Sequence, residues 1–396
     1  MKIAAKGLRQ RSVSSLVAVG AAALACSLLM LVWAFKKEAE QSFVGMNGGF
    51  DAVLGPRGSK LQLVLNGLFH MDQAAGLMAQ SDYEQIKNTR GVDAAYPIAV
   101  GDNYRGFRIV GTVVEYLRDH AYETGEGFVV EKGGRLFEGA NKEAVVGSFA
   151  AKHLGLRLGD TFHAYHGYIF DEKTKHEDIF EVVGVLEPTG TPADRVLWVP
   201  LQGIQQMSGH DPNAATDVSA VLVKYNPRAR MLAFQLNNLY NKQGNRLTLA
   251  WPVNSILMDF FRKISWFDKA LQGIGYLVAL IAASSLFAIL YNAMNERKRD
   301  IAVLRALGAR RSLVFGIGIL ESLGIAIGGV VLGFAAYGGI GWAVSLLVYQ
   351  QTGVPLEVFQ ANKAMLWAPL GMLGLSLMAG VLPAAKAYRT DVARNL

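Results

Sequence analysis

Four long apolar segments constrain the fold of this chain more than any other feature of its sequence. Leu16 to Phe35 runs for 20 residues without a charged side chain. At 1.5 Å per residue, a helix of that length covers the hydrocarbon core of a bilayer, about 30 Å thick. Three similar segments follow residue 267. The sequence therefore predicts a membrane protein with four transmembrane α-helices, at residues 16–35, 268–294, 312–348 and 364–385.

The placement of basic residues predicts how these helices are oriented. The net charge is +7, and basic residues concentrate in residues 1–15, in 295–311 and in the tail 386–396. Because short basic segments stay in the cytoplasm, both termini and the loop after the second helix are expected there. Residues 36–267 are then extracytoplasmic, with a short external loop at 349–363. This distribution indicates membrane orientation and not nucleic-acid binding.

The first and third segments each allow an alternative. The basic flank and the run Ala23-Leu24-Ala25-Cys26 resemble a cleavable signal peptide, but Leu28 to Phe35 extends the apolar run beyond the usual length. We expect a retained anchor. The third segment is longer than one span, yet two short spans would place the basic tail outside. We therefore expect one long helix, continuous or broken in its glycine-rich part, that projects outward.

Residues 36–267 alternate as a mixed α/β domain. Strands are expected at 94–100, 107–114, 128–130, 144–146, 180–186, 196–200 and 218–224, and helices at 61–68, 81–88, 148–154, 201–207 and 227–241. The glycine-rich stretch 48–60 does not have the spacing of a phosphate-binding Walker A loop. A flexible connection is expected there, with a substrate-gating segment as the alternative. Helical spacing in 256–269 predicts a stalk that extends the second transmembrane helix outward.

Three histidines form the one cluster in the sequence with metal-ligand chemistry. His163, His166 and His176 lie among several acidic residues, and imidazole with carboxylate suits zinc. Their spacing matches no compact site, so a solvated charged hairpin is the preferred interpretation and metal binding the alternative. The single cysteine, Cys26, allows neither a disulfide nor a cysteine-based zinc site within one chain.

The basic stretch 295–311 separates the second and third transmembrane helices. It has six basic and two acidic residues, and its apolar residues recur at helical spacing. It is too highly charged to lie in lipid, so a short amphipathic helix is expected on the membrane surface or in a partner's groove. An ordinary positively charged loop is the alternative.

The run from Glu296 to Ala309, ERKRDIAVLRALGA, resembles the cytoplasmic coupling helix of the FtsX/MacB/LolC permeases. The resemblance implies that this helix docks on an ATP-binding cassette subunit, and that ATP and Mg²⁺ are bound by that separate ATPase. It implies two ATPase copies, a second permease subunit as homodimer or paralogue heterodimer, and a periplasmic adaptor as a further candidate partner. The implied docking residues are Glu296, Arg297, Ile301, Leu304, Arg305, Leu307 and Gly308.

Two other regions carry the same resemblance. Val145-Val146-Gly147, Gly159-Asp160 and the strand-like run 180–186 are similar to the periplasmic core domain of MacB-type permeases. Pro383-Ala384-Ala385 with Lys386-Ala387 resembles the closing motif of the family. The implied fold is a four-helix membrane protein with a large extracytoplasmic mixed α/β domain between helices 1 and 2. A bacterial inner membrane is the implied location.

Two features of the third apolar segment are candidate internal sites. Glu321 lies nine residues inside it, at a depth of about 13–14 Å, where an ionised carboxylate is expensive. It should face other helices or a wet cavity, in a structural or a gating role. Glycines spaced by four or five residues predict close helix packing, with simple flexibility as the alternative. These are Gly324, Gly328, Gly329 and Gly333.

The sequence thus predicts a non-catalytic permease subunit that couples ATP hydrolysis in a partner chain to conformational change outside the cytoplasm. The resemblance implies export or extraction of a lipophilic or peptide-like substrate by mechanotransmission. The alternative is an FtsX-like signalling permease that transports nothing and activates a cell-envelope hydrolase or sensor. We find no sequence motif of a catalytic site, and no Walker A motif occurs in the chain.

Overall fold

The computed structural model describes residues 12–45, 47–71, 73–121, 127–139, 142–208, 216–296, 299, 303, 306–352, 359 and 363–388. The chain divides into two compact units. A helical unit comprises residues 1–39, 264–347 and 356–396, and an α/β unit comprises residues 40–263 and 348–355.

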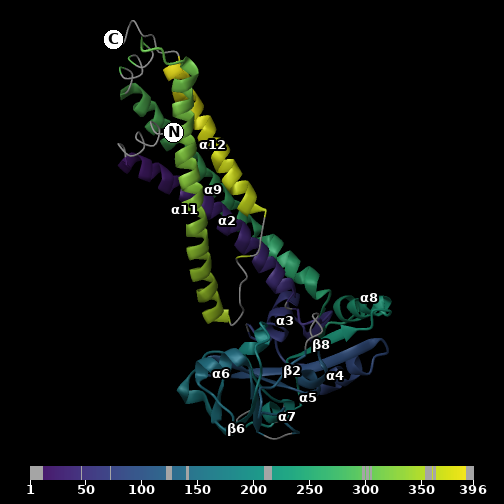
Figure 1. Ribbon diagram of the computed structural model, residues 1–396. Coiled ribbons are helices and arrows are strands. Elements are labelled where there is room, and N and C mark those ends of the chain that lie inside the picture. The colour runs from purple at the N-terminus through teal and green to yellow at the C-terminus, as the bar shows by residue number, and fades with distance from the viewer. Residues whose placement is uncertain are drawn as a thin grey trace. The chain divides into compact units, whose positions relative to one another are not determined.

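Four long helices carry all the candidate membrane spans of the described residues, which confirms the expected number. They are α2 (Ser12–Gly45), α9 (Val253–Glu296), α11 (Arg311–Thr352) and α12 (Ala364–Tyr388). Figure 1 shows them packed along one another in the helical unit. The glycine-rich third segment is one continuous α-helix, and α12 stays helical through Pro369 and Pro383.

Small residues hold α11 close to α2. A Cβ atom added at Gly329 would lie 2.5 Å from the Cβ of Ala22, and one at Gly333 would lie 3.0 Å from the Cβ of Cys26. Gly328 has Val19 at contact distance. Because only hydrogen fits at Gly329, the two backbones approach more closely than any larger side chain would allow. These short distances are consistent with the packing role predicted for these glycines.

Gly324 departs from that expectation, because it lies on the exposed side of α11. The reason is helical periodicity. Residues nine apart are separated by about 900° of rotation, half a turn out of phase, so Gly324 and Gly333 face opposite sides. Regular spacing in the sequence did not ensure a shared face.

The outer parts of α2 and α9 are joined by a charged contact. Lys36 Nζ lies 3.8 Å from Asp268 Oδ2, and both side chains are half-buried. One turn further along α9, toward its carboxyl end, the helix continues as an apolar span. A pair of this kind contributes little energy, about 0–1 kcal/mol, but it fixes which faces of the two helices meet.

The α/β unit contains nine strands among its described residues. They are β1 (Ala52–Pro56), β2 (Val92–Tyr104), β3 (Phe107–Thr112), β4 (Glu143–Val146), β5 (Thr161–His166), β6 (Lys175–Val185), β7 (Leu197–Pro200), β8 (Ala220–Tyr225) and β9 (Leu247–Ala250). Its α-helices are α3 (Lys60–Gly67), α4 (Gln80–Lys87), α5 (Val114–Asp119), α6 (Ser148–Leu154), α7 (Leu201–Gln205) and α8 (Arg230–Asn238). Short helical turns occur at Glu172–Thr174, Pro192–Arg195 and Leu239–Gln243.

Strand β2 is the element that both parts of this sheet share. Its first half pairs with β8, which continues to β1 and β9 in an antiparallel sheet. Its second half pairs with β3 and β5. Since β3-β7-β4-β6-β5 are consecutive neighbours and β3 also pairs with β2, six strands close into a ring of pairings. The register shifts between Val100 and Asp102, where β2 passes from one part to the other.

The central strands are buried on both faces. In β1, Leu54 belongs to one hydrophobic cluster and Val53 to the other. In β8, Val221 and Leu222 divide in the same way. Helices α4 and α8 cover one side, and α3 covers the other. A strand that is buried on both faces has a continuous run of apolar residues in its sequence, and apolar and polar residues do not alternate along it.

Several strand predictions were wrong or incomplete. Residues 128–130 form no strand, and Val130 makes only an isolated bridge to Leu186. The stretch expected as a flexible connection contains β1, which is buried throughout. Strands β5 and β9 were also not predicted. Their short runs carry little local signal, because the pairing partners that stabilise them lie far away in the sequence.

We predict that Gly329→Leu destabilises the helical unit, whereas Gly324→Leu does not. Overpacking a close helix contact costs about 1–3 kcal/mol, while an exposed helical glycine replaced by leucine gains helix propensity, up to about 1 kcal/mol. Thermal unfolding of both variants in detergent checks this. An equal melting temperature for Gly329→Leu and the parent protein would contradict the close packing described above.

Candidate functional site

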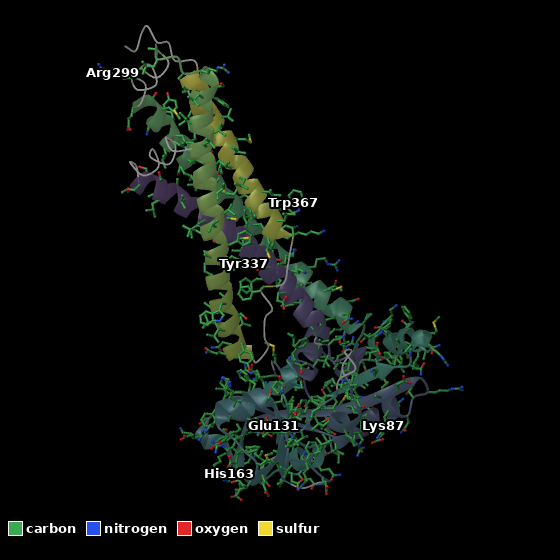
Figure 2. All side chains as sticks on the ribbon, viewed as in Figure 1. Lys87, Glu131, His163, Arg299, Tyr337 and Trp367 are labelled. Atoms are coloured by element: carbon green, nitrogen blue, oxygen red, sulfur yellow. The ribbon has the colours of Figure 1, made fainter. Side chains whose placement is uncertain are left out.

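The expected docking residues lie in the segment between α9 and α11, of which the structure describes part. Glu296 ends α9 and is exposed, as are the single described positions Arg299 and Val303. Arg297, Ile301, Leu304 and Arg305 lie outside the described residues. Figure 2 labels Arg299 in this segment.

The described end of this segment has one helical hydrogen bond, and the helical conformation ends at Gly308. The amide of Leu307 donates a hydrogen bond to the Val303 carbonyl, the i to i−4 pattern of a helix. Gly308 follows with φ +97°, a value that ends helices and that other residues rarely adopt. The side chain of Leu307 is 81% exposed. A large apolar side chain is thus presented outward at the end of a basic helical segment.

Glu321 lies on the buried face of α11 and is only 3% exposed. Ile325, one turn later on the same stripe, packs with Ala18, Leu286 and Leu290 from α2 and α9. Glu321 therefore faces the interior of the helix bundle and not its outer surface. This fits the expectation that a carboxylate at this depth is internal, and it leaves the choice between a structural and a gating role open.

A polar contact adjoins Glu321. The Ser322 hydroxyl donates a hydrogen bond to the Ser376 carbonyl of α12, and both serines are fully buried. A Cβ atom at Gly380 would lie 2.7 Å from the Cβ of Ser322. Polar side chains at such a close approach tie α11 to α12 within the apolar unit.

An apolar groove of about 320 Å³ lies among α2, α9 and α12. Aromatic side chains line it, and Trp33, Tyr276 and Trp367 are all exposed. Figure 2 shows Trp367 projecting from α12 away from its neighbours. Lys363 stands at the start of α12 beside the groove. Aromatic rings with a cation at one end are typical of the membrane interface.

A larger and more polar cleft, of about 990 Å³, lies in the α/β unit. Helix α4 contributes Tyr83, Glu84 and Lys87, and α7 contributes Gln202 and Gln205. Lys87 Nζ lies 5.4 Å from the centre of the Tyr83 ring, and hydrogen bonding to Tyr83 raises the pKa of Lys87. The cleft offers amide, hydroxyl and charged groups beside apolar ones such as Phe137 and Leu201.

The structure brings two of the three predicted histidines together. His166 and His176 meet at Asp102, while the imidazole of His163 contacts the backbone carbonyl of His176. The hydrogen bond to Asp102 raises the pKa of His176, against the opposing effect of burial. Asp102 lies 64 residues before His166, inside a strand, and nothing in its local sequence pointed to this group.

Two protein-family models match the chain. A MacB-like periplasmic core domain matches residues 15–237, and an FtsX-like permease C-terminal domain matches residues 273–392. Strand β9 and the first turns of α9 lie between the two matches, in residues 238–272, and are covered by neither.

The curated relatives are ABC transporter proteins. The uncharacterized permease YvrN of Bacillus subtilis (strain 168) is 24% identical over 228 residues, or 56% of this chain and 51% of YvrN. MacB of Hyphomonas neptunium, a macrolide export ATP-binding/permease protein, is 26% identical over 225 residues, or 54% of this chain and 32% of that protein. The permease YtrF of Bacillus subtilis is 26% identical over 136 residues, or 32% of this chain and 31% of YtrF. The chain thus spans about half the length, or less, of these relatives.

Two solved structures align with part of the chain. The periplasmic region of MacB from Actinobacillus actinomycetemcomitans aligns with TM-score 0.36 and 13% identity, over 54% of this chain and 94% of that one. The extracellular domain of the transporter YknZ from Gram-positive bacteria aligns with TM-score 0.30 and 16% identity, over 50% and 97%.

We predict that Glu321→Gln assembles normally and that Glu321→Lys does not. Gln keeps the size and hydrogen-bonding capacity of the side chain, whereas Lys brings a new charge into a buried position, at a cost of about 3 kcal/mol. Expression level and size-exclusion profile of the detergent-solubilised variants measure the outcome. If the two variants behave alike, Glu321 is not enclosed by the neighbouring helices.

Proposed function

This chain belongs to the MacB/FtsX family of ABC transporter permeases, and from that membership we propose that it works with a separate ATPase subunit whose ATP hydrolysis moves the α/β domain. ATP and Mg²⁺ bind in that partner chain. The permease itself performs no chemistry and transmits a mechanical change. In this arrangement the segment 295–311 and both termini are cytoplasmic, and the α/β unit lies outside the cytoplasm.

The continuity of α9 carries this proposal. Its first turns belong to the α/β unit, where Val253 and Leu257 are buried in the hydrophobic core. The same helix continues without a break to Glu296, over 44 residues. At 1.5 Å per residue this is about 66 Å, twice the thickness of the hydrocarbon core. A displacement at the Glu296 end therefore has an unbroken hydrogen-bonded path to the domain core.

The segment after Glu296 is the proposed docking surface for the ATPase. Its described residues combine exposed apolar side chains, Val303 and Leu307, with the exposed cation Arg299. An apolar stripe bordered by charge is how an amphipathic helix binds in a partner's groove. Glu296, Arg297, Ile301, Leu304, Arg305 and Gly308 complete the proposed surface.

A second permease subunit is part of the proposal, because four helices are too few to enclose a pathway. Many large apolar side chains of α9 and α11 remain exposed in the described helices, among them Leu280, Ile281 and Val331. In the proposed dimer, some of these exposed side chains contact the second subunit and the others contact lipid. The family resemblance implies either a homodimer or a heterodimer with a paralogue, served by two ATPase subunits.

The proposed substrate is lipophilic or peptide-like. The groove beside Trp33 and Trp367 is lined by apolar and aromatic side chains that suit an acyl chain. The polar cleft of the α/β unit suits a peptide or a periplasmic adaptor. Export and extraction from the membrane are both compatible with these surfaces. The second candidate function is signalling, in which the α/β domain activates an envelope hydrolase or sensor and nothing is transported.

We predict that Leu307→Asp reduces the amount of ATPase subunit that co-purifies with the chain from native membranes in mild detergent. A charge at the centre of an apolar contact weakens binding on the order of tenfold or more. Leu158→Asp is the matched control, because Leu158 is an exposed leucine of the α/β unit. Quantitative mass spectrometry measures the ATPase to permease ratio. Equal ratios in the parent and Leu307→Asp would remove Leu307 from the docking surface, and the absence of any ATPase would overturn the coupling proposal.

Transport and signalling make different predictions for the reconstituted complex. If the complex transports, we expect a lipophilic substrate in the bilayer to raise its ATPase rate without any other protein. If it signals, only a protein that binds the α/β domain should raise the rate. ATP hydrolysis in proteoliposomes, with and without added lipid extract or envelope proteins, distinguishes the two.

A further inference from the structure

Asp102, His166 and His176 form a compact group that plays no part in the permease function proposed above. They come from three different strands, β2, β5 and β6. Asp102 Oδ1 lies 3.1 Å from His176 Nε2 and 3.3 Å from His166 Nδ1. The three ligand atoms all lie within 4.8 Å of one another.

The pairing of the strands explains why these residues meet. Asp102 and His166 are directly opposite in the antiparallel pair of β2 and β5, so their side chains are close cross-strand neighbours. Asp102 follows the register shift in β2, and another shift occurs in β5 between His163 and Tyr165. Bulges of this kind turn side chains to new directions and are common at functional sites. Figure 2 labels His163, which lies on the same hairpin.

The surrounding backbone determines the protonation of His176. Its Nδ1 lies 2.6 Å from the Ser208 carbonyl, which can only accept a hydrogen bond. Nδ1 must therefore carry the hydrogen. Nε2 then faces the carboxylate of Asp102, which is fully buried. A neutral imidazole would place a lone pair against an anionic oxygen at 3.1 Å, so a cation is required between them, either a proton or a metal ion.

The distances within the group suit a metal ion. Zinc binds histidine nitrogen and carboxylate oxygen at about 2.0–2.1 Å, and two tetrahedral ligands at that distance are about 3.3 Å apart. The two separations from Asp102 to the histidine nitrogens are 3.1 and 3.3 Å, and the two nitrogens lie within 4.8 Å of each other. The Ser208 carbonyl accepts a hydrogen bond from His176 Nδ1, and zinc-binding histidines usually donate their other ring N–H to a backbone carbonyl or carboxylate in this way. The His166 side chain is 60% exposed, which leaves solvent access to a fourth position.

We propose that Asp102, His166 and His176 bind a divalent first-row transition metal, with Zn²⁺ as the ion tested first. Two imidazoles with one carboxylate favour zinc or iron over calcium and magnesium, which prefer oxygen ligands. The bound ion joins β2 to the β5–β6 hairpin at the point where β2 changes partners. The site goes beyond the proposed permease function and does not depend on it.

Binding of Zn²⁺ to the full chain in detergent tests the site. The protein is purified through a histidine-free tag, stripped with a chelator, and titrated with Zn²⁺ by calorimetry and with Co²⁺ by visible absorption. We expect a site of one ion per chain and the d–d bands of a nitrogen- and oxygen-bound Co²⁺ ion that Zn²⁺ displaces. Zn²⁺ should also raise the melting temperature, because it binds the folded state.

Variants locate the site within the cluster. His166→Gln is the main variant, because His166 is exposed and its replacement should leave the fold intact. Loss of a second-shell partner alone weakens metal affinity by about 10- to 100-fold, and loss of a direct ligand should weaken it at least as much. His153→Gln is the matched control and should bind as the parent does, because His153 is an exposed histidine of α6 that takes no part in the group. Asp102→Asn should abolish the Co²⁺ spectrum.

Two results would overturn the proposal. If the parent chain binds no Zn²⁺, the group is a protonated His176 paired with Asp102. If His166→Gln binds Zn²⁺ as tightly as the parent, or if His153→Gln loses binding equally, the ion lies elsewhere. A folded His166→Gln protein, judged by its size-exclusion profile, keeps either result interpretable.

Discussion

Backbone amide and carbonyl groups cannot reach water inside the hydrocarbon core, so every span must satisfy them within one helix. The remaining features of the helical unit follow from this requirement. Helices in lipid gain little from hydrophobic burial against one another and are held by close packing and polar contacts. Gly329 against Ala22, and the Ser322 to Ser376 hydrogen bond, supply both kinds of contact. Glu321 is tolerated because the same packing encloses it.

In the proposed function, the same requirement allows α9 to act as a mechanical element. A helix that must stay intact across the bilayer can continue beyond it, and α9 does so until Val253 and Leu257 become part of the α/β core. In the proposed orientation, one set of backbone hydrogen bonds connects the cytoplasmic end of α9 to the outer domain. The proposed role of the chain needs no catalytic group, since it depends on the stiffness of this helix and on a docking surface at its end.

In the α/β unit, strand β2 is the element that connects the two parts of the sheet. Its first half completes an antiparallel sheet and its second half completes a ring of six strands. The register shift beside Asp102 lies where these two parts meet. A metal ion bound there would strengthen the joint, because it adds bonds between β2 and the β5–β6 hairpin. The proposed metal site thus lies next to register shifts in both β2 and β5.

The sequence by itself determined the membrane spans, the class of the domain between them and the family resemblance of the basic segment. These are local properties, since hydropathy and charge act within about 20 consecutive residues. Only the tertiary structure decided the strand order, the burial of β1 and the replacement of His163 by Asp102 in the histidine cluster. It also decided that Gly324 is exposed. The physical reason is that strand pairing, bulges and helix faces depend on contacts between residues far apart in the chain, which no local pattern records.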